Sequence, residues 1–185
     1  MSLLVRSRQI KKEADSLLRQ TALLEFLEKL GKMNFVGSYR YDLMIDGDVD
    51  LHIVNPLFTK EKSVAVLNAL IKANKFRGYL YYDFTARRRA GFPKGYYIGL
   101  KTKFKGRKWK IDIWLLKKAS RNDDIARLVE RYSNPRTKLQ ILRLKDIVKA
   151  KRLPFTSVEI YRAVFLNDVR NLSDLKRLTA DKLLF

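Results

Sequence analysis

The sequence predicts a mixed α+β fold in which helices flank a mixed or antiparallel sheet. Short runs of alternating apolar and polar residues, typical of strands, fall between residues 48 and 113. Segments with the apolar spacing of helices precede, interrupt and follow these runs. We therefore expect a core over residues 1–118 and a helical C-terminal segment over residues 119–185.

Helical spacing is clearest near the start of the chain and in its last third. Residues 6–31 carry apolar residues at three-, four- and seven-residue steps and end at Gly31, so one amphipathic helix is predicted there. A second helix is predicted over residues 60–74, and a helical pattern resumes at about residue 122. Prolines divide this last region, which predicts several helices.

Caps indicate where two of the later helices begin. Thr156 and Glu159 have the spacing of a capping box, in which each side chain accepts from a free backbone N–H of the first turn. Ser173 is the predicted cap of the last helix.

Strands are predicted over residues 34–36, 48–54 and 78–84, and the segment YYIGLKTKFKGRKWKIDIWLL predicts a hairpin. A two-residue turn at Gly106-Arg107 would set Lys101 opposite Asp112, and a four-residue loop is the alternative. In that register one face is apolar, and the other carries polar side chains. The polar face holds Lys101, Lys103, Lys108, Lys110 and Asp112.

Charge is the strongest compositional feature. The 185 residues include 40 Lys and Arg against 19 Asp and Glu, a formal net charge of +21. Such a chain attracts polyanions, which are nucleic acids, nucleotides or an acidic membrane surface. The absence of cysteine excludes disulfides, thiol nucleophiles and thiolate zinc sites. No signal peptide and no membrane span is evident, so a soluble cytoplasmic protein is expected.

The run Asp46-Gly47-Asp48-Val49-Asp50 places carboxylates at alternate positions and predicts a cation site. An EF-hand loop beginning at Asp46 would need glycine at its sixth position and glutamate at its twelfth. Those positions hold Leu51 and Leu57, so the EF-hand is excluded.

A site for two divalent ions fits better. In a strand, Asp48, Asp50 and His52 share one face, and two carboxylates lie about 6–7 Å apart along it. Two divalent ions about 3.5–4 Å apart can clamp the entering and leaving oxygens of a phosphate. The third carboxylate must come from a neighbouring strand, and Asp112 is the one acid within the apolar run KWKIDIWLL. These three carboxylates are the predicted metal ligands.

The order of these motifs resembles the nucleotidyltransferase superfamily typified by DNA polymerase beta. Gly37-Ser38 is followed by Asp48-x-Asp50 and then by Asp112 on a later strand. The resemblance covers roughly residues 30–118 and suggests a small stand-alone member with a nucleotidyltransferase-like core. The segment after Gly37-Ser38 departs from many small members in its bulky residues, Tyr39, Tyr41 and Leu43.

The resemblance implies a role for each motif. Gly37 and Ser38 would hold a nucleoside triphosphate such as ATP. Asp48 and Asp50 would bind two Mg²⁺ (or Mn²⁺) ions, and Asp112 would bind the catalytic ion and help take the proton from an acceptor hydroxyl. The implied reaction transfers a nucleoside monophosphate to that hydroxyl and releases pyrophosphate.

Basic residues offer further nucleotide contacts. Arg40 either contacts the triphosphate or is an exposed arginine at a helix start. Lys101 and Lys110 share the face of Asp112, and we predict phosphate contact for them, because like charges on one face repel unless an anion is present. The loop TARRRAGFPKG is either an acceptor-binding loop or a basic surface loop; its cations are Arg87, Arg88, Arg89 and Lys94.

A histidine and several tyrosines leave two interpretations open. His52 is either a metal ligand or proton carrier, or a polar residue at a strand end. Aromatic side chains either stack on a nucleobase or are ordinary strand residues; these are Tyr81, Tyr82, Tyr96 and Tyr97.

Three functions compete on the sequence alone. The first is an active metal-dependent nucleotidyltransferase. The second is a non-catalytic nucleic-acid-binding module with the same fold, and the third is a small subunit that acts with a partner chain. The acceptor is open among an RNA or DNA end, a protein side chain, a nucleotide and a small hydroxylated molecule. The net charge of +21 favours a nucleic acid.

Overall fold

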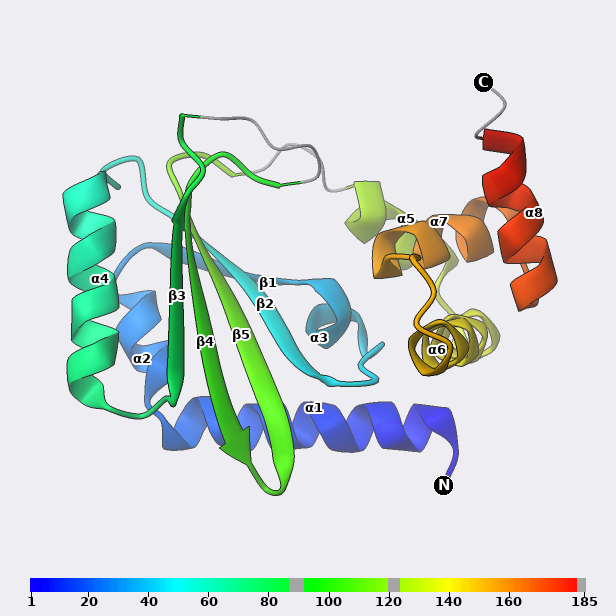
Figure 1. Cartoon of the computed structure of the whole chain (residues 1–185), viewed down its shortest axis with the longest axis horizontal. Helices are drawn as coiled ribbons and strands as arrows, with labels where there is room; N and C mark the ends of the chain where they lie inside the picture. Colours follow the sequence, from blue (N-terminus) through cyan, green and yellow to red (C-terminus); the bar gives the residue numbers. More distant parts are fainter. Residues whose placement is uncertain (87–91, 120–123, 183–185) are drawn as a thin grey trace. The chain divides into compact units, whose positions relative to one another are not determined.

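A computed structural model describes residues 1–86, 92–119 and 124–182, and within these ranges the chain forms five strands and eight helices (Figure 1). The chain divides into two compact units. One is Gln9–Ser120, and the other combines Met1–Arg8 with Arg121–Phe185. The mixed α+β class predicted from the sequence is confirmed.

The strands of the first unit form one sheet in the order β1-β2-β5-β4-β3. Strands β2 and β5 are parallel, whereas every other neighbouring pair is antiparallel. The sheet is therefore mixed. The strands are β1 (Lys32–Val36), β2 (Gly47–Val54), β3 (Gly78–Asp83), β4 (Tyr96–Phe104) and β5 (Arg107–Leu116).

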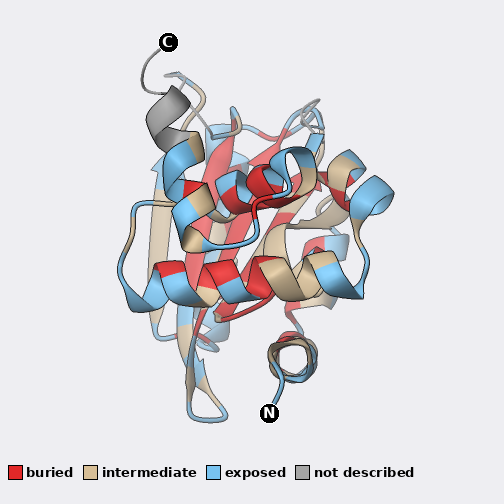
Figure 2. Ribbon diagram, turned by 90° about the vertical axis from the view of Figure 1, so that its right-hand side faces the viewer, coloured by how far each residue is buried: buried red, intermediate tan, exposed pale blue. Residues whose placement is uncertain are grey.

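Helices cover the apolar face of this sheet. Buried side chains of α1 (Leu3–Gln20), α2 (Leu23–Glu28) and α4 (Lys60–Ala73) join those of the strands in one core. Figure 2 shows how burial concentrates along the strands. The opposite sheet face is left for polar and aromatic residues, because side chains alternate between the two faces of a strand.

The single helix predicted over residues 6–31 is wrong, because the chain forms α1 and α2 with a break between them. Ala22 takes a left-handed conformation with φ 53°. The hydroxyl of Thr21 donates to the carbonyl of Leu17 at 2.9 Å at the end of α1. The apolar spacing continues across the break, since Leu23 and Leu27 are as buried as the apolar residues of α1.

The predicted hairpin forms, but its register differs by two residues. The turn is Lys105-Gly106, both with positive φ (46° and 78°), which is the requirement of a type I′ turn. Phe104 therefore lies opposite Arg107, and Asp112 lies opposite Gly99 instead of Lys101. A shift of two residues keeps every side chain on its predicted face, whereas a shift of one would exchange the faces.

The second unit is helical. It contains α5 (Asp124–Tyr132), α6 (Pro135–Ala150), α7 (Ser157–Asn167) and α8 (Leu172–Lys182). The capping box of Thr156 and Glu159 is confirmed at the start of α7. The predicted cap Ser173 is wrong: Asn171 accepts from the backbone N–H of Asp174 at 3.0 Å. None of the described helices is long and apolar enough to cross a membrane.

Candidate functional site

Three carboxylates converge on the polar face of the sheet. Asp50 on β2 lies directly opposite Asp112 on β5 in the parallel ladder. Asp48 precedes Asp50 by two residues, which places it on the same face of β2. One oxygen from each of these side chains lies within 4.8 Å of the others. We call Asp48, Asp50 and Asp112 the acidic triad.

Strand alternation on β2 explains how the triad is held. Val49, Leu51 and Ile53 are completely buried in the core, so the intervening side chains must point to the other face. Asp48 and Asp50 are half-buried there. The convergence predicted from the sequence is thus present for these three carboxylates, which come from two separate strands.

Asp112 is the most enclosed of the triad, with 7% of its surface exposed. The hydroxyl of Tyr97 donates to its Oδ1 at 2.7 Å, and the ammonium of Lys110 donates to its Oδ2 at 2.5 Å. These two bonds compensate the cost of burying a carboxylate. They also fix its orientation toward Asp48 and Asp50.

The neighbours of Asp112 have altered acidities. Burial and the hydrogen bond to Asp112 raise the pKa of the Tyr97 hydroxyl. Burial lowers the pKa of the Lys110 ammonium, but the hydrogen bond to Asp112 and the attraction of Asp48 outweigh it, so the net pKa is raised. Lys110 is therefore a firmly protonated counter-ion of the triad.

Sequence reasoning missed the pairing of Tyr97 with Asp112 and the role of Gly99. Gly99 lies opposite Asp112, and a Cβ atom at Gly99 would come within 2.5 Å of the Tyr97 hydroxyl oxygen. The missing side chain therefore makes room for Tyr97 to reach Asp112. A glycine inside an apolar strand is the signal that could have found this close approach.

Gly37 and Ser38 begin the short helix α3 (Gly37–Tyr41) beside the triad. Gly37 has φ +64°, and a Cβ atom there would lie 2.5 Å from Oδ2 of Asp50. The turn predicted to hold a triphosphate thus contacts a triad carboxylate directly. Ser38, the second residue of α3, has a backbone carbonyl that accepts from the N–H of Leu43 at 2.9 Å.

The bulky residues after Ser38 are buried or have partners on other elements. The ring of Tyr39 is tilted by 46° against that of Phe35, with centroids 4.6 Å apart, and its hydroxyl donates to Asp15 on α1 at 2.6 Å. Tyr41 and Leu43 are buried, with 8% and 0% of their surfaces exposed. Tyr39 therefore connects α3 to β1 and α1.

The other predicted contacts lie outside the group of three carboxylates. Lys101 is exposed and lies opposite Lys110 in the ladder, next to the position of Asp112. Arg40 is exposed, with its guanidinium 5.5 Å from the ring centroid of Tyr41. His52 lies between Asn34 and Trp114 in the ladder, on the triad face but outside the group of three carboxylates.

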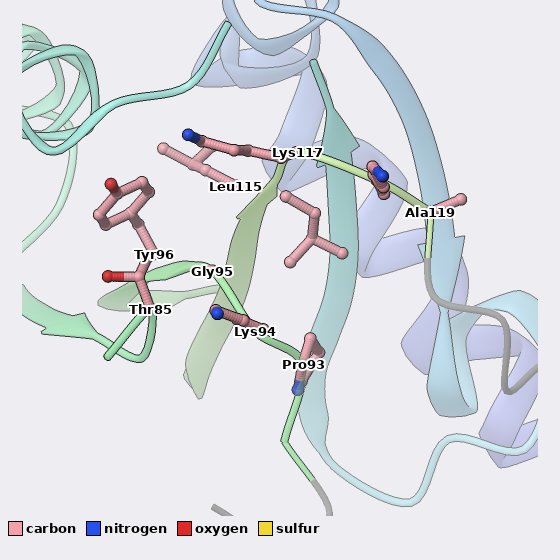
Figure 3. Close-up of a pocket in the computed structure, with 10 residues that line it drawn as sticks. Thr85, Pro93, Lys94, Gly95, Tyr96, Leu115, Lys117 and Ala119 are labelled. Atoms are coloured by element: carbon pink, nitrogen blue, oxygen red, sulfur yellow. The ribbon is translucent and has the colours of Figure 1, made fainter. Parts of the chain in front are cut away.

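Part of the basic loop lies outside the described residues. This applies to Arg87, Arg88 and Arg89. Lys94 lines a pocket of about 600 Å³ between the start of β4 and the end of β5 (Figure 3). No triad residue lines this pocket. Its lining is Thr85, Pro93, Lys94, Gly95, Tyr96, Leu115, Leu116, Lys117, Lys118 and Ala119.

Comparisons with known proteins identify the fold. No protein-family model matches the sequence, and no curated protein matches it. Among solved structures, the chain is similar to the polymerase core of TRAMP, an RNA surveillance complex, with a TM-score of 0.57 and 19% identity over 85% of this chain and 48% of that one. A cytoplasmic RNA terminal U-transferase matches with a TM-score of 0.57 and 19% identity over 84% of this chain and 47% of that one.

These likenesses confirm the fold predicted from the three motifs, since both structures have a nucleotidyltransferase core. The chain has the nucleotidyltransferase fold, a mixed sheet flanked by helices. It spans about half the length of each of the two solved chains.

Proposed function

We propose that this protein is a metal-dependent nucleotidyltransferase. It transfers a nucleoside monophosphate from a nucleoside triphosphate to the hydroxyl of a nucleic-acid acceptor, and pyrophosphate leaves. The observation that carries this proposal is the convergence of the acidic triad, with an oxygen of each carboxylate within 4.8 Å of the others.

The donor set fits a hard divalent cation. Mg²⁺ and Mn²⁺ prefer carboxylate oxygens, and three carboxylates brought this close repel one another unless cations compensate them. We assign Asp48, Asp50 and Asp112 as the ligands. Divalent ions bound there would neutralise the charge that develops on the transferring phosphoryl group.

The remaining residues bind and orient the substrates. Gly37 brings backbone close to the triad and, with Ser38, contacts the triphosphate. Lys110, Lys101 and the exposed Arg40 of α3 contact phosphate oxygens. When substrate binds, the ammonium of Lys110 releases Asp112 and contacts a phosphate oxygen instead.

The chemistry proceeds in line. The acceptor oxygen attacks the α-phosphorus, the bond from that phosphorus to the bridging oxygen breaks, and pyrophosphate departs with the electron pair. The acceptor proton passes to Oδ2 of Asp112, the oxygen that faces Lys110 in this structure. Tyr97 holds the other oxygen of this carboxylate and keeps it oriented.

A nucleic-acid acceptor is favoured by charge and by the structural neighbours. The chain carries a net charge of +21, which attracts a polyanion. One neighbour is the polymerase core of an RNA surveillance complex, and the other is an RNA terminal U-transferase. We therefore propose RNA as the first acceptor to test, with DNA beside it.

Calorimetry tests the metal and nucleotide together. Each of the four ribonucleoside triphosphates is titrated into the protein with Mg²⁺, with Mn²⁺ and with a chelator. Metal-dependent binding of a triphosphate, followed by extension of a labelled single strand, supports the enzyme. Asp112→Asn is the matched control, since it removes one metal ligand and keeps the shape of the side chain.

The same measurements separate the enzyme from a non-catalytic binding module. The module is favoured by the net charge alone. It predicts binding of long nucleic acid that weakens with salt and is indifferent to divalent ions. Carboxylates in the middle of a nucleic-acid surface oppose such binding unless cations neutralise them, which is why the enzyme is preferred.

A further inference from the structure

An aromatic cluster lies on the same sheet face as the acidic triad. Trp114, Tyr97 and Tyr82 pair in register across β5, β4 and β3. The ring centroids of Tyr97 and Trp114 are 5.2 Å apart, and those of Tyr82 and Tyr97 are 6.0 Å apart. Phe84 lies 5.4 Å from Trp114, and Phe92 stacks on Phe84 at 5.6 Å with an interplanar angle of 12°.

Two of these five rings are open to solvent. Tyr82 is 52% exposed and Phe92 is 47% exposed, whereas Tyr97 and Trp114 are buried beneath them. Tyr82 lies on β3 and packs against Tyr97, and Phe92 precedes β4 and stacks on Phe84. Aromatic side chains held in this way lose little conformational entropy when a flat ligand covers them. Such a surface is suited to stacking on nucleobases, and stacking is tolerant of base identity.

The cluster extends from the triad in one direction only. It starts at Tyr97, whose hydroxyl donates to Asp112 at 2.7 Å, and it continues over β5, β4 and β3. Gly37 follows β1, at the opposite side of the sheet, and approaches Asp50. In the proposed function the triphosphate lies against Gly37, so the aromatic cluster lies on the side from which the acceptor approaches Asp112.

Cations lie next to the rings at the end of the sheet, in a pocket that Tyr96 and Leu115 of the core also line. Leu116 packs against Tyr97 and Trp114, and it also lines the pocket of about 600 Å³ at the end of β5. Lys94, Lys117 and Lys118 line the same pocket, and Figure 3 shows the first two of these side chains around it. Exposed rings beside a lysine-lined pocket match the alternating bases and phosphates of a single strand.

We propose that the aromatic cluster and the lysine-lined pocket bind the last unpaired nucleotides of a single-stranded nucleic-acid acceptor. Bases stack on Tyr82 and Phe92, and phosphates of the preceding nucleotides contact Lys117 and Lys118. This inference rests on the proposed function, because it assigns the strand whose terminal hydroxyl is presented to Asp112. An apolar protein partner would not need the lysines, so a nucleic acid is the better occupant.

Oligonucleotide binding, measured in the absence of catalysis, tests the proposed single-strand surface. The full chain is titrated against labelled RNA and DNA single strands of about 12 nucleotides with Mg²⁺ and without a triphosphate, and fluorescence anisotropy reports the dissociation constant. We expect Tyr82→Ala and Phe92→Ala each to weaken binding by about fivefold or more. Tyr82→Phe keeps the ring and should bind like wild type. Tyr132→Ala removes an aromatic side chain that is 38% exposed on α5, and it serves as the control.

The lysines are tested by salt dependence. Replacing both Lys117 and Lys118 by alanine should lower the slope of log affinity against log salt by about 1.4, since each phosphate contact on a single strand contributes about 0.7. Lys72→Ala on α4 removes an exposed lysine from the helical side of the sheet and should leave the slope unchanged.

The outcomes separate this inference from the proposed function. Alanine variants at Tyr82 and Phe92 that fold normally and bind both strands like wild type would overturn it. A loss of triphosphate binding in these variants, with oligonucleotide binding intact, would also overturn it and assign the rings to the incoming base. If the wild-type protein binds single strands through these rings but transfers no nucleotide, the proposed catalytic function is wrong and the proposed binding surface is supported. Preference between RNA and DNA identifies the acceptor.

Discussion

Asp50 and Asp112 lie opposite each other on neighbouring parallel strands, and this pairing brings together two carboxylates that are far apart in the sequence. Two like charges this close are unfavourable by themselves. The sheet holds them because the residues before and after each carboxylate are buried in the core. We therefore expect the triad to lower the stability of the metal-free protein and to provide a cation site.

Asparagine at any triad position should abolish transfer, because an amide is a poor ligand for Mg²⁺ and cannot accept the acceptor proton. Asp48→Asn should keep or raise the unfolding temperature of the metal-free protein, since it removes a like charge. Asp112→Asn should lower stability by about 1 kcal/mol, because the ion pair with Lys110 is lost. Activity assays and thermal melts with a chelator measure both effects.

Metal provides the control for these variants. Mg²⁺ or Mn²⁺ binds the folded state and should raise the unfolding temperature of the wild type in a concentration-dependent way. This shift should be reduced in all three asparagine variants. Wild-type transfer by any of them would refute the assignment of that carboxylate as a ligand.

In this structure the ammonium of Lys110 donates to Oδ2 of Asp112, so it competes with a metal ion for this carboxylate. Lys110→Met removes the competing ammonium, so we expect Mn²⁺ to bind several-fold more tightly in the absence of nucleotide. Transfer should nevertheless be slower, because a phosphate contact is lost. Lys103→Met is the control. Lys103 lies on β4 opposite Lys108, on the same face of the sheet as Lys110. An unchanged or weaker affinity for Mn²⁺ would argue against competition between the ammonium and the metal.

Local patterns predict one part of this site well. The alternation of Asp48 to Ile53 assigns both faces of β2, because the period of two follows from strand geometry alone. The apolar run around Asp112 likewise predicts a strand with one acid on its polar face. Both inferences need only neighbouring residues. Alternating burial confirms the first on β2, and the convergence of Asp112 with Asp48 and Asp50 confirms the second.

Features that depend on chain segments far apart could not be predicted in the same way. Two hairpin registers place Gly106 in the turn and keep the same faces, so the sequence pattern does not distinguish them. The importance of Gly99 follows only from its neighbour Tyr97 and its partner across the ladder, Asp112. The break at Ala22 was missed because apolar residues keep their spacing on both sides of it.

Stability at high pH should depend on Tyr39. Burial and the hydrogen bond to Asp15 raise the pKa of the Tyr39 hydroxyl above its ordinary value. The folded state thus holds this proton more tightly, so its contribution is complete below about pH 10 and is lost as the pH rises above that. Tyr39→Phe should cost about 1 kcal/mol at neutral pH, and the difference from wild type should shrink above about pH 10. Urea unfolding at several pH values measures this, and a widening difference would contradict it.

Gly37 and Gly106 form a matched pair for testing the turn beside the triad. Both have positive φ, so alanine strains the backbone at each position. A Cβ atom at Gly37 would also lie 2.5 Å from Oδ2 of Asp50, whereas one at Gly106 meets nothing within 4 Å. Gly37→Ala and Gly106→Ala should therefore both lose about 1 kcal/mol of stability, but only the first should lose transfer activity and metal affinity. Equal activity of the two variants would show that the turn does not position Asp50.

A double-mutant cycle tests whether Gly99 acts through Tyr97. Tyr97→Phe removes the hydroxyl that donates to Asp112, and Gly99→Ala places a Cβ atom 2.5 Å from that hydroxyl oxygen and displaces it. If the hydrogen bond orients Asp112, each change should lower kcat by about tenfold with little change in the KM of the triphosphate. The double variant should be no slower than the slower single variant, because both changes remove the same interaction. Independent, multiplying losses would mean that Gly99 serves strand packing and that the tyrosine hydroxyl does not position the carboxylate.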